Sequence, residues 1–147
     1  MDLINAIDIA ASGMKAQRSR INVISANLAN ANTTRTEDGS PYRRKTVIFQ
    51  STPINRSFED ELNDWLSGED SVYGVHVTDI VPVGGEFKKI YDPSHPDADP
   101  QGFVYLPNVN LVQEMVQMLN ANRGYEANAT AIRTSKEMAL RALEMWK

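Results

Sequence analysis

The last forty residues of the chain, 108–147, carry a regular pattern of apolar positions. The positions recur with an average step of 3.5 residues, which is typical of a helix that packs along its whole length against other helices. The pattern is formed by Leu111, Met115, Met118, Asn122, Tyr125, Ala129, Ile132, Lys136, Ala139, Leu143 and Trp146. At ~1.5 Å per residue the predicted helix is roughly 55 Å long. One ordinary small domain could not easily cover it.

The sequence also marks where this helix begins. Pro107 ends the preceding segment, and either Asn108 or Asn110 can cap the helix. Asn110 has Gln113 three residues later, in the position of a reciprocal cap. Gly124 lies inside the helix, where it costs about 0.5–1 kcal/mol relative to alanine. It is either a tolerated weak point or a place of close backbone approach.

The first 32 residues repeat the same pattern and predict a second long helix. Its positions are Leu3, Ile7, Ala10, Met14, Gln17, Ile21, Ile24, Leu28 and Ala31. An asparagine- and threonine-rich stretch over residues 27–34 predicts the end of the helix, because these side chains compete for backbone hydrogen bonds. Gly13 lies within the helix and is expected to be tolerated at a similar small cost.

Three arrangements would bury the two apolar stripes. Both helices could pack on one core, they could pair with each other in a parallel or antiparallel hairpin, or they could pair with helices of other molecules. Narrow stripes bury little on a core of their own, so we favour pairing between helices. In any such pairing Gln17 and Asn122 are candidates for setting the register.

The middle of the chain, 33–107, predicts a small β-rich insert. Four segments read as strands: 45–50, 73–83, 86–91 and 102–106. Gly84-Gly85 predicts a hairpin turn between the second and third of these. The predicted fold class is therefore α+β, with a coiled-coil domain made from residues 1–32 and 108–147 and a β-rich domain at 33–107.

One further short helix is predicted within this insert. Phe58, Leu62, Trp65 and Leu66 fall on one helical face, and Ser57 can cap the helix.

Charge and composition narrow the class of protein. Residues 33–107 hold seven Lys/Arg against thirteen Asp/Glu, whereas both ends are close to neutral. An acidic middle argues against nucleic-acid binding, and Arg43-Arg44-Lys45 is the only basic run. The chain has no cysteine, and no apolar run approaches the ~20 residues of a membrane span. Residues 1–3 lack the basic stretch of a cleavable signal peptide.

The segment 92–100 is the strongest candidate for chemistry. Its three aspartates and His95 invite a metal-binding interpretation, but counting an EF-hand loop from Asp97 places Asn108 where a glutamate is needed. Proline at three of nine positions favours stacked turns instead. No familiar catalytic or phosphate-binding motif is present, so we expect no enzyme activity, no cofactor, no metal and no small-molecule substrate. A cell-wall hydrolase acting through Asp97 and Asp99, and a soluble peptide-binding adaptor, are the alternatives.

Two sets of residues resemble the family of flagellar rod and hook proteins. Residues 12–18 (SGMKAQR) and 22–34 (NVISANLANANTT) are similar to the N-terminal signature of that family. Residues 41–44 (PYRR), 92–99 (DPSHPDAD), 102–104, 107–110 and 125–128 (YEAN) resemble its proximal-rod members. The resemblance covers essentially the whole chain, although Gly124 and the region 60–71 depart from it.

The resemblance implies a structural subunit of the proximal rod of the bacterial flagellar basal body, which transmits torque and conducts exported proteins. Its terminal helices would assemble into a helical tube with copies of itself, other proximal-rod proteins, a rod-to-ring adaptor and the distal rod protein. Export through the flagellar type III apparatus without a cleaved signal, and a periplasmic location, are implied too. The expected assembly interface comprises Leu3, Ile7, Met14, Ile21, Ile24, Leu28, Leu111, Met115, Met118, Asn122, Tyr125, Ile132 and Leu143.

Overall fold

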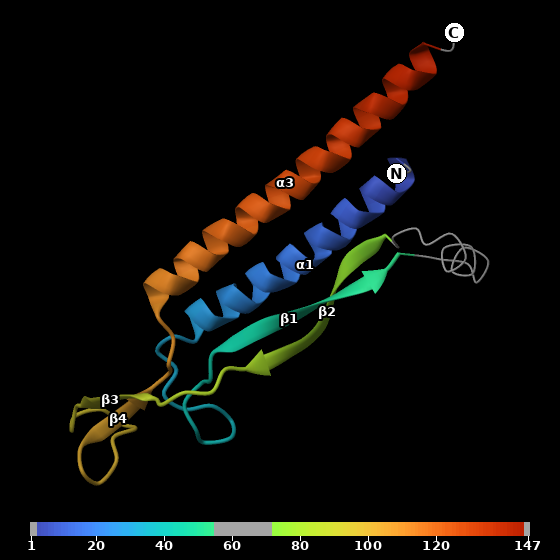
Figure 1. Cartoon of the computed structure of the whole chain (residues 1–147). Helices are drawn as coiled ribbons and strands as arrows, with labels where there is room; N and C mark the ends of the chain where they lie inside the picture. The colour runs from blue at the N-terminus through green and yellow to red at the C-terminus, as the bar shows by residue number, and fades with distance from the viewer. Residues whose placement is uncertain (1–2, 55–71, 146–147) are drawn as a thin grey trace. The chain divides into compact units, whose positions relative to one another are not determined.

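Within the residues that the structure describes, the chain forms two long helices and four strands (Figure 1). The computed structural model describes residues 3–54 and 72–145 of the 147. In chain order the elements are α1 (Leu3–Ala29), β1 (Lys45–Pro53), β2 (Tyr73–Pro82), β3 (Lys88–Tyr91), β4 (Phe103–Leu106) and α3 (Leu111–Glu144). The α+β prediction is confirmed. The short helix predicted around 58–66 lies outside the described residues.

The end of α1 and the start of α3 form as the sequence predicts. At the end of α1, the side-chain nitrogen of Asn30 donates to the Ala26 carbonyl at 2.9 Å, and the backbone N–H of Thr33 donates to the Asn30 carbonyl at 3.1 Å. At the start of α3, the Asn110 side-chain oxygen accepts from the backbone N–H groups of Val112 (3.1 Å) and Gln113 (3.4 Å). Asn110 is therefore the N-cap, because it satisfies two of the otherwise unpaired donors of the first turn.

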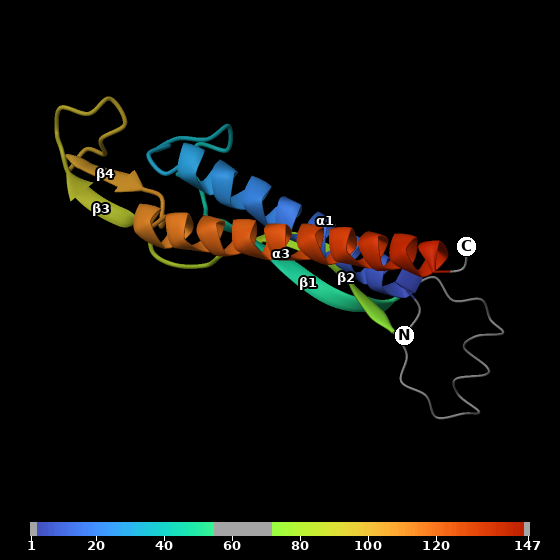
Figure 2. The same cartoon turned by 90° about the horizontal axis from the view of Figure 1, so that it is seen from above.

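The strands form two separate two-stranded sheets, β1 with β2 and β3 with β4 (Figure 2). Lys88 pairs with Leu106 and Tyr91 with Phe103 in the antiparallel β3–β4 ladder. The predicted hairpin between the second and third strands through Gly84-Gly85 is therefore wrong. Tight two-residue hairpin turns need positive φ at their first central residue, but only Gly85 of this pair has positive φ (151°).

The chain divides into two compact units, and each long helix contributes to both. The first unit combines Met1–Ser19, Phe49–Thr78 and Asn122–Lys147, and the second combines Arg20–Ile48 and Asp79–Ala121. The predicted division into domains at 1–32, 33–107 and 108–147 stays a prediction.

In the first unit α1 and α3 are antiparallel and closely packed. A Cβ atom added to Gly13 would lie 2.7 Å from Asn128 Nδ2, and one added to Gly124 would lie 3.2 Å from Gln17 Nε2. Moving four residues forward on α1 thus corresponds to moving four residues back on α3. Of the pairings left open by the sequence, the structure contains the antiparallel hairpin. At Gly124 the close neighbour is a side chain, that of Gln17, and not a backbone.

Strand β2 also packs against α1 in the first unit. The backbone N–H of Val75 donates to Ser12 Oγ at 3.0 Å, and this hydroxyl donates to the Ile9 carbonyl at 2.7 Å. A Cβ on Gly74 would lie 2.9 Å from Ser12 Oγ, so glycine permits this close approach.

The second unit has a small apolar core and an aromatic ladder. The buried apolar side chains of this unit are Val23, Ile24, Ala31, Val104, Val109 and Ala121. On the β3–β4 ladder, Tyr91 and Phe103 meet edge to face with ring centroids 5.3 Å apart, and Lys89 Nζ lies 4.0 Å from the Phe103 centroid. Among the described residues, neither helix contains a stretch long and apolar enough to cross a membrane.

Candidate assembly interface

Helix α3 has one covered face, and this face is not the predicted apolar stripe. In the second unit Glu114 and Ala121 are buried, and in the first unit Ser135 is buried while Gly124 and Asn128 are partly covered. These residues are small or polar. They allow the helices to approach closely, which large side chains at the same positions would prevent.

Most of the predicted α3 positions are exposed in the single chain. Leu111, Met115 and Leu143 are 45%, 55% and 68% exposed. Asn122 and Tyr125 are also exposed, whereas Met118 and Ile132 are half-buried. Within this hairpin, the predicted α3 stripe is therefore not the face that α1 covers. The reason is that its covered face is built around Gly124 and the polar residues that flank it, so the larger apolar side chains lie outside the contact.

The predicted positions on α1 are better covered. Ile24 is buried, and the other five are half-buried: Leu3, Ile7, Met14, Ile21 and Leu28. The structure therefore places the two halves of the predicted interface differently, because the α1 positions are mostly half-buried and the α3 positions are mostly exposed. The role of these thirteen residues in assembly stays a prediction.

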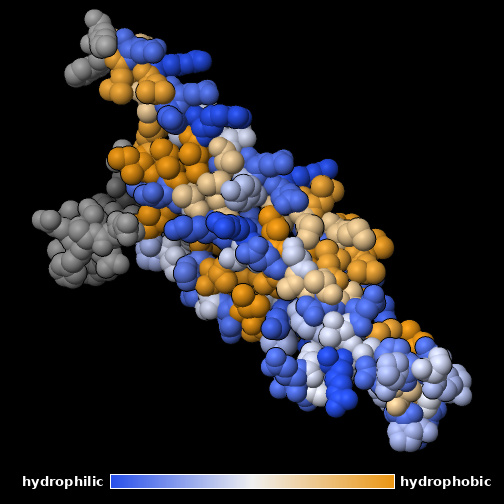
Figure 3. All heavy atoms as spheres, turned by 180° about the vertical axis from the view of Figure 1, so that it is seen from behind, coloured by the Kyte–Doolittle hydropathy of each residue, from blue (hydrophilic) through white to orange (hydrophobic). Residues whose placement is uncertain are grey.

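The exposed apolar residues of α3 extend beyond the predicted stripe. In the second unit Leu111, Val112, Met115, Val116 and Leu119 are exposed, and we call this set the α3 apolar stripe. In the first unit Met138, Leu140, Leu143 and Met145 are exposed as well. Figure 3 shows exposed hydrophobic side chains, in orange, interrupted by hydrophilic ones. Monomeric soluble proteins rarely expose contiguous large apolar patches without a binding role.

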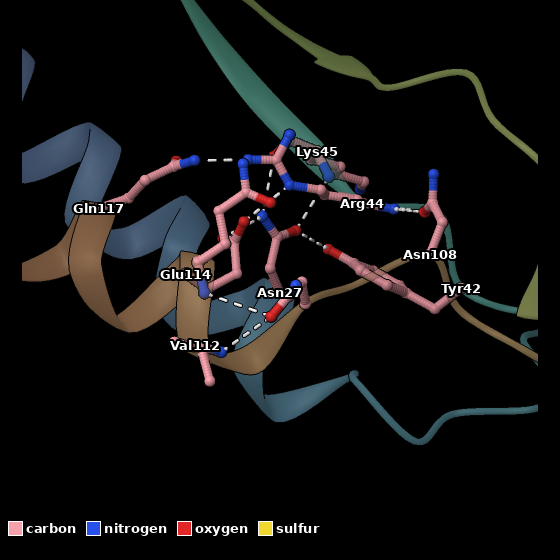
Figure 4. Close-up of polar contacts among 10 residues, drawn as sticks. Asn27, Tyr42, Arg44, Lys45, Asn108, Val112, Glu114 and Gln117 are labelled. Atoms are coloured by element: carbon pink, nitrogen blue, oxygen red, sulfur yellow. Dashed lines mark hydrogen bonds and ion pairs between the residues drawn. The ribbon is translucent and has the colours of Figure 1, made fainter.

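A buried polar cluster lies at the start of α3 in the second unit (Figure 4). Asn27 is 1% exposed and Glu114 is fully buried. The Asn27 amide nitrogen donates to Glu114 Oε2 at 3.0 Å and to the Lys45 carbonyl at 2.9 Å. The Asn27 side-chain oxygen accepts from the Lys45 N–H at 2.9 Å and from the Tyr42 hydroxyl at 3.0 Å. One side chain of α1 thus joins α3 to the start of β1.

Arg44 supplies the positive charge that balances Glu114. Its Nε donates to Glu114 Oε1 at 2.7 Å, and its Nη2 donates to Gln117 Oε1 at 3.3 Å. Asn108 accepts from the Arg44 backbone N–H at 3.3 Å. A buried carboxylate is costly without a partner, so this ion pair and the Asn27 amide are what allow Glu114 to remain inside.

The cluster also affects the ionisation of Tyr42. Burial raises the pKa of its hydroxyl above the ordinary value of 10.0, and the nearby Glu114 charge raises that pKa further. Both causes favour the neutral phenol, which is the form that donates to Asn27.

Sequence reasoning did not identify this cluster. In the sequence, Asn27 belongs to the helix-ending stretch and to the 22–34 motif, and Arg44 belongs to the basic run and to the 41–44 motif; neither pattern shows that the two side chains lie near Glu114. Glu114 offered the clearest signal, because it is the only acidic residue between Asp99 and Glu126 and falls next to an apolar stripe. A lone acid in the first turn of a helix is nevertheless usual, since it interacts favourably with the helix dipole.

The segment 92–100 forms turns, as its prolines and aspartates indicate. Asp92 Oδ1 accepts from the Ser94 N–H (3.1 Å) and hydroxyl (2.6 Å), and these bonds lower the pKa of the Asp92 carboxyl. Asp99 Oδ1 accepts from the N–H groups of Gln101 and Phe103, both at 2.9 Å. Across residues 3–54 and 72–145 no group of three His, Asp or Glu side chains is arranged to hold a metal ion. Asp92 and Asp99 therefore act as turn-forming acceptors, whereas Asp97 Oδ2 accepts from the Thr34 hydroxyl at 2.7 Å.

Two segments of the chain, one near each end, match families of known proteins. Residues 7–35 match the family described as "Flagella basal body rod protein", and residues 101–145 match "Flagellar basal body rod FlgEFG protein C-terminal". Both terminal segments thus carry the features of flagellar basal-body rod proteins.

Full-length relatives make the assignment more specific. The flagellar basal-body rod protein FlgC of Borreliella burgdorferi is 46% identical over 148 residues, which cover 97% of each chain. That of Bacillus subtilis is 41% identical over 152 residues and the whole of both chains. That of Salmonella typhimurium is 39% identical over 145 residues, or 99% of this chain and 98% of the relative. The chain belongs to the family of the flagellar basal-body rod protein FlgC.

This membership decides the class of function. The resemblance found in the sequence is confirmed, and the chain is a structural subunit of the rod of the flagellar basal body. At the level of the family it is a structural protein and not an enzyme. Membership in a rod family also implies assembly with other rod components.

Proposed function

We propose that the chain is a subunit of the proximal part of the rod and that it joins its neighbours through the α3 apolar stripe. The contact would be heterologous, with one patch on a subunit meeting a different patch on the next, because such contacts extend into helical arrays when they do not close. The neighbours would be copies of the chain, other proximal-rod proteins, the rod-to-ring adaptor and the distal rod protein. The resulting tube would transmit torque and conduct exported proteins.

The observation that carries this proposal is the exposure of large apolar side chains on a helix that already has its own partner. In the second unit α1 contributes Asn27 against Glu114, and this pairing leaves Leu111, Met115 and Leu119 outside. Fully burying a side chain of this kind is worth about 1.5–3 kcal/mol. These side chains are already partly covered in the single chain, so each would gain part of this amount, and covering the whole stripe would favour association with a neighbour.

The half-buried positions of α1 would contribute a second contact surface. Leu3, Ile7, Met14 and Ile21 are only partly covered by the chain itself, so a neighbouring helix can complete their burial. The proposal includes a periplasmic location and export through the flagellar type III apparatus without a cleaved signal, as the resemblance to rod proteins implies.

Electron microscopy of the purified protein, alone and mixed with other rod subunits, tests the proposal. We expect helical or tubular particles from the unaltered chain and none from Met115→Glu, which introduces a charge into the stripe. Asn120→Glu is a matched control, because this exposed polar position lies on the same helix outside the stripe. Both variants should unfold within about 0.5 kcal/mol of the unaltered protein, since both sites are on the surface. Equal assembly by the two variants would refute the role of the stripe.

A further inference from the structure

The Asn27 side chain uses all of its hydrogen-bonding capacity. An amide offers two N–H donors and one oxygen with two lone pairs. The donors go to the Lys45 carbonyl and Glu114 Oε2, and the oxygen accepts from the Lys45 N–H and the Tyr42 hydroxyl, with all four distances between 2.9 and 3.0 Å. Asn27 is also almost completely buried, so no water needs to complete the set.

Two of these bonds reproduce the hydrogen bonding between neighbouring β-strands. The Asn27 side-chain amide donates one hydrogen bond to the Lys45 carbonyl and accepts one from the Lys45 N–H. Two directly paired residues in an antiparallel ladder exchange hydrogen bonds in the same way. Lys45 is the first residue of β1. The other two bonds reach Tyr42, just before the strand, and Glu114, in the first turn of α3. A single side chain of α1 therefore connects this helix to two segments that are distant in sequence, residues 42–45 and the first turn of α3.

Only asparagine supplies this combination. Leucine has a comparable shape but no donors or acceptors, and the extra methylene of glutamine would move the amide away from these four partners. Aspartate has the shape of asparagine but carries an acceptor where the amide nitrogen donates. Its carboxylate would face the Lys45 carbonyl and the Glu114 carboxylate at about 3 Å.

We propose that Asn27 is a positioning residue that sets how α1, the start of β1 and the first turn of α3 meet. Directional bonds in a buried position penalise every other register, whereas apolar contacts tolerate sliding. Single buried polar residues fix register in this way in coiled coils. The role differs from the proposed assembly role of the α3 apolar stripe, because Asn27 and Glu114 are buried within the chain and cannot contact a neighbouring subunit.

Asn27→Asp tests the proposal through the pH dependence of stability. The ionisable groups around position 27 are Glu114 on α3 and Tyr42 and Arg44 before β1. Arg20 on α1 and Lys45 on β1 line the small cavity beside them. At pH 8 two adjacent carboxylates would lie beside this cavity and beside Arg44, the cation paired with Glu114. We expect the folding equilibrium constant to fall about 100-fold or more relative to the unaltered protein.

At pH 5 the same variant should regain most of the stability that it loses at pH 8. Two carboxylates at this distance bind one proton more tightly in the folded state than in the unfolded chain, so the folded pair stabilises the protein at low pH and loses that advantage as pH rises. The protonated oxygen also restores one donor. The deficit should shrink to roughly 10-fold or less. Asn22→Asp adds the same charge at an exposed position of α1 and should show little deficit at either pH.

A second variant separates positioning from a general loss of fit. Asn27→Asp combined with Glu114→Gln exchanges the amide and the carboxylate, so a donor again faces an acceptor between α1 and α3. At pH 8 this double variant should fold with an equilibrium constant at least about 10-fold higher than that of Asn27→Asp alone. Should Asn27→Asp be unfolded at pH 8, the double variant at pH 8 and the single variant at pH 5 should both fold. A deficit independent of pH, or no recovery in the double variant, would overturn the proposal.

Discussion

Replacing Glu114 with alanine would remove the acceptor shared by Arg44 and Asn27. The deleted carboxylate accepts from Arg44 Nε at 2.7 Å and from Asn27 Nδ2 at 3.0 Å. Truncating one member of a buried ion pair usually costs about 3–5 kcal/mol, because the remaining charge stays buried and unpaired. The Arg44 side chain is 18% exposed and regains some water, so the lower end, about 3 kcal/mol, is expected. Small domains have total stabilities of about 5–15 kcal/mol, so this loss is large.

Urea unfolding of the isolated chain at pH 7, followed by circular dichroism of the helices, measures this loss. Glu114→Gln keeps a carbonyl acceptor and the side-chain shape, so it should lose less than the alanine variant. Glu137→Ala removes an exposed carboxylate from the same helix and should change the free energy of unfolding by no more than about 0.5 kcal/mol. If Glu114→Ala cost as little as Glu137→Ala, the cluster would not hold α3 in place.

Three further substitutions test individual contacts. Tyr42→Phe removes the donor to Asn27 and should cost about 1 kcal/mol in urea unfolding near pH 7. Because the folded pKa of Tyr42 lies above its unfolded value of 10.0, the phenol's contribution is complete below pH 10 and is lost as pH rises through the folded pKa, so the variant should lose less stability than the unaltered protein above pH 10. Asn110→Ala removes the cap of α3 and should cost about 1 kcal/mol, with faster amide exchange confined to the first turn; unchanged exchange there would contradict the capping role. Gly13→Ala should fail to give the usual helix gain of about 0.5–1 kcal/mol because its Cβ meets Asn128, and combining it with Asn128→Ala should restore that gain in thermal unfolding.

The sequence predicts the elements of this fold well because local rules govern them. The apolar period locates α1 and α3, Asn110 marks the start of α3, and the β-branched segments become strands. Strand pairing follows from contacts distant in sequence, which local patterns do not contain. The segment at Gly84-Gly85 therefore looks like a hairpin turn although β2 pairs with β1 and β3 with β4.

In the candidate interface, too, local sequence predicts some features, and contacts between distant residues decide the others. The apolar period includes Leu111, Met115 and Leu143, which are exposed in the single chain, but it does not say which partner covers them. The face that α1 covers is built from Glu114, Ala121 and Gly124, which give no hydrophobic signal. Asn27 could not be distinguished from its asparagine neighbours, because its importance lies in four bonds made to residues 42, 45 and 114.

Cysteine labelling of the α3 apolar stripe in assembled basal bodies tests the central claim most directly. The chain has no cysteine of its own, so Met115→Cys introduces a single thiol at a position that is exposed in the isolated chain. The account predicts fast reaction with a maleimide reagent in the free subunit and strong protection in the assembled rod. Equally fast labelling in both states, in rods that support motility, would contradict it.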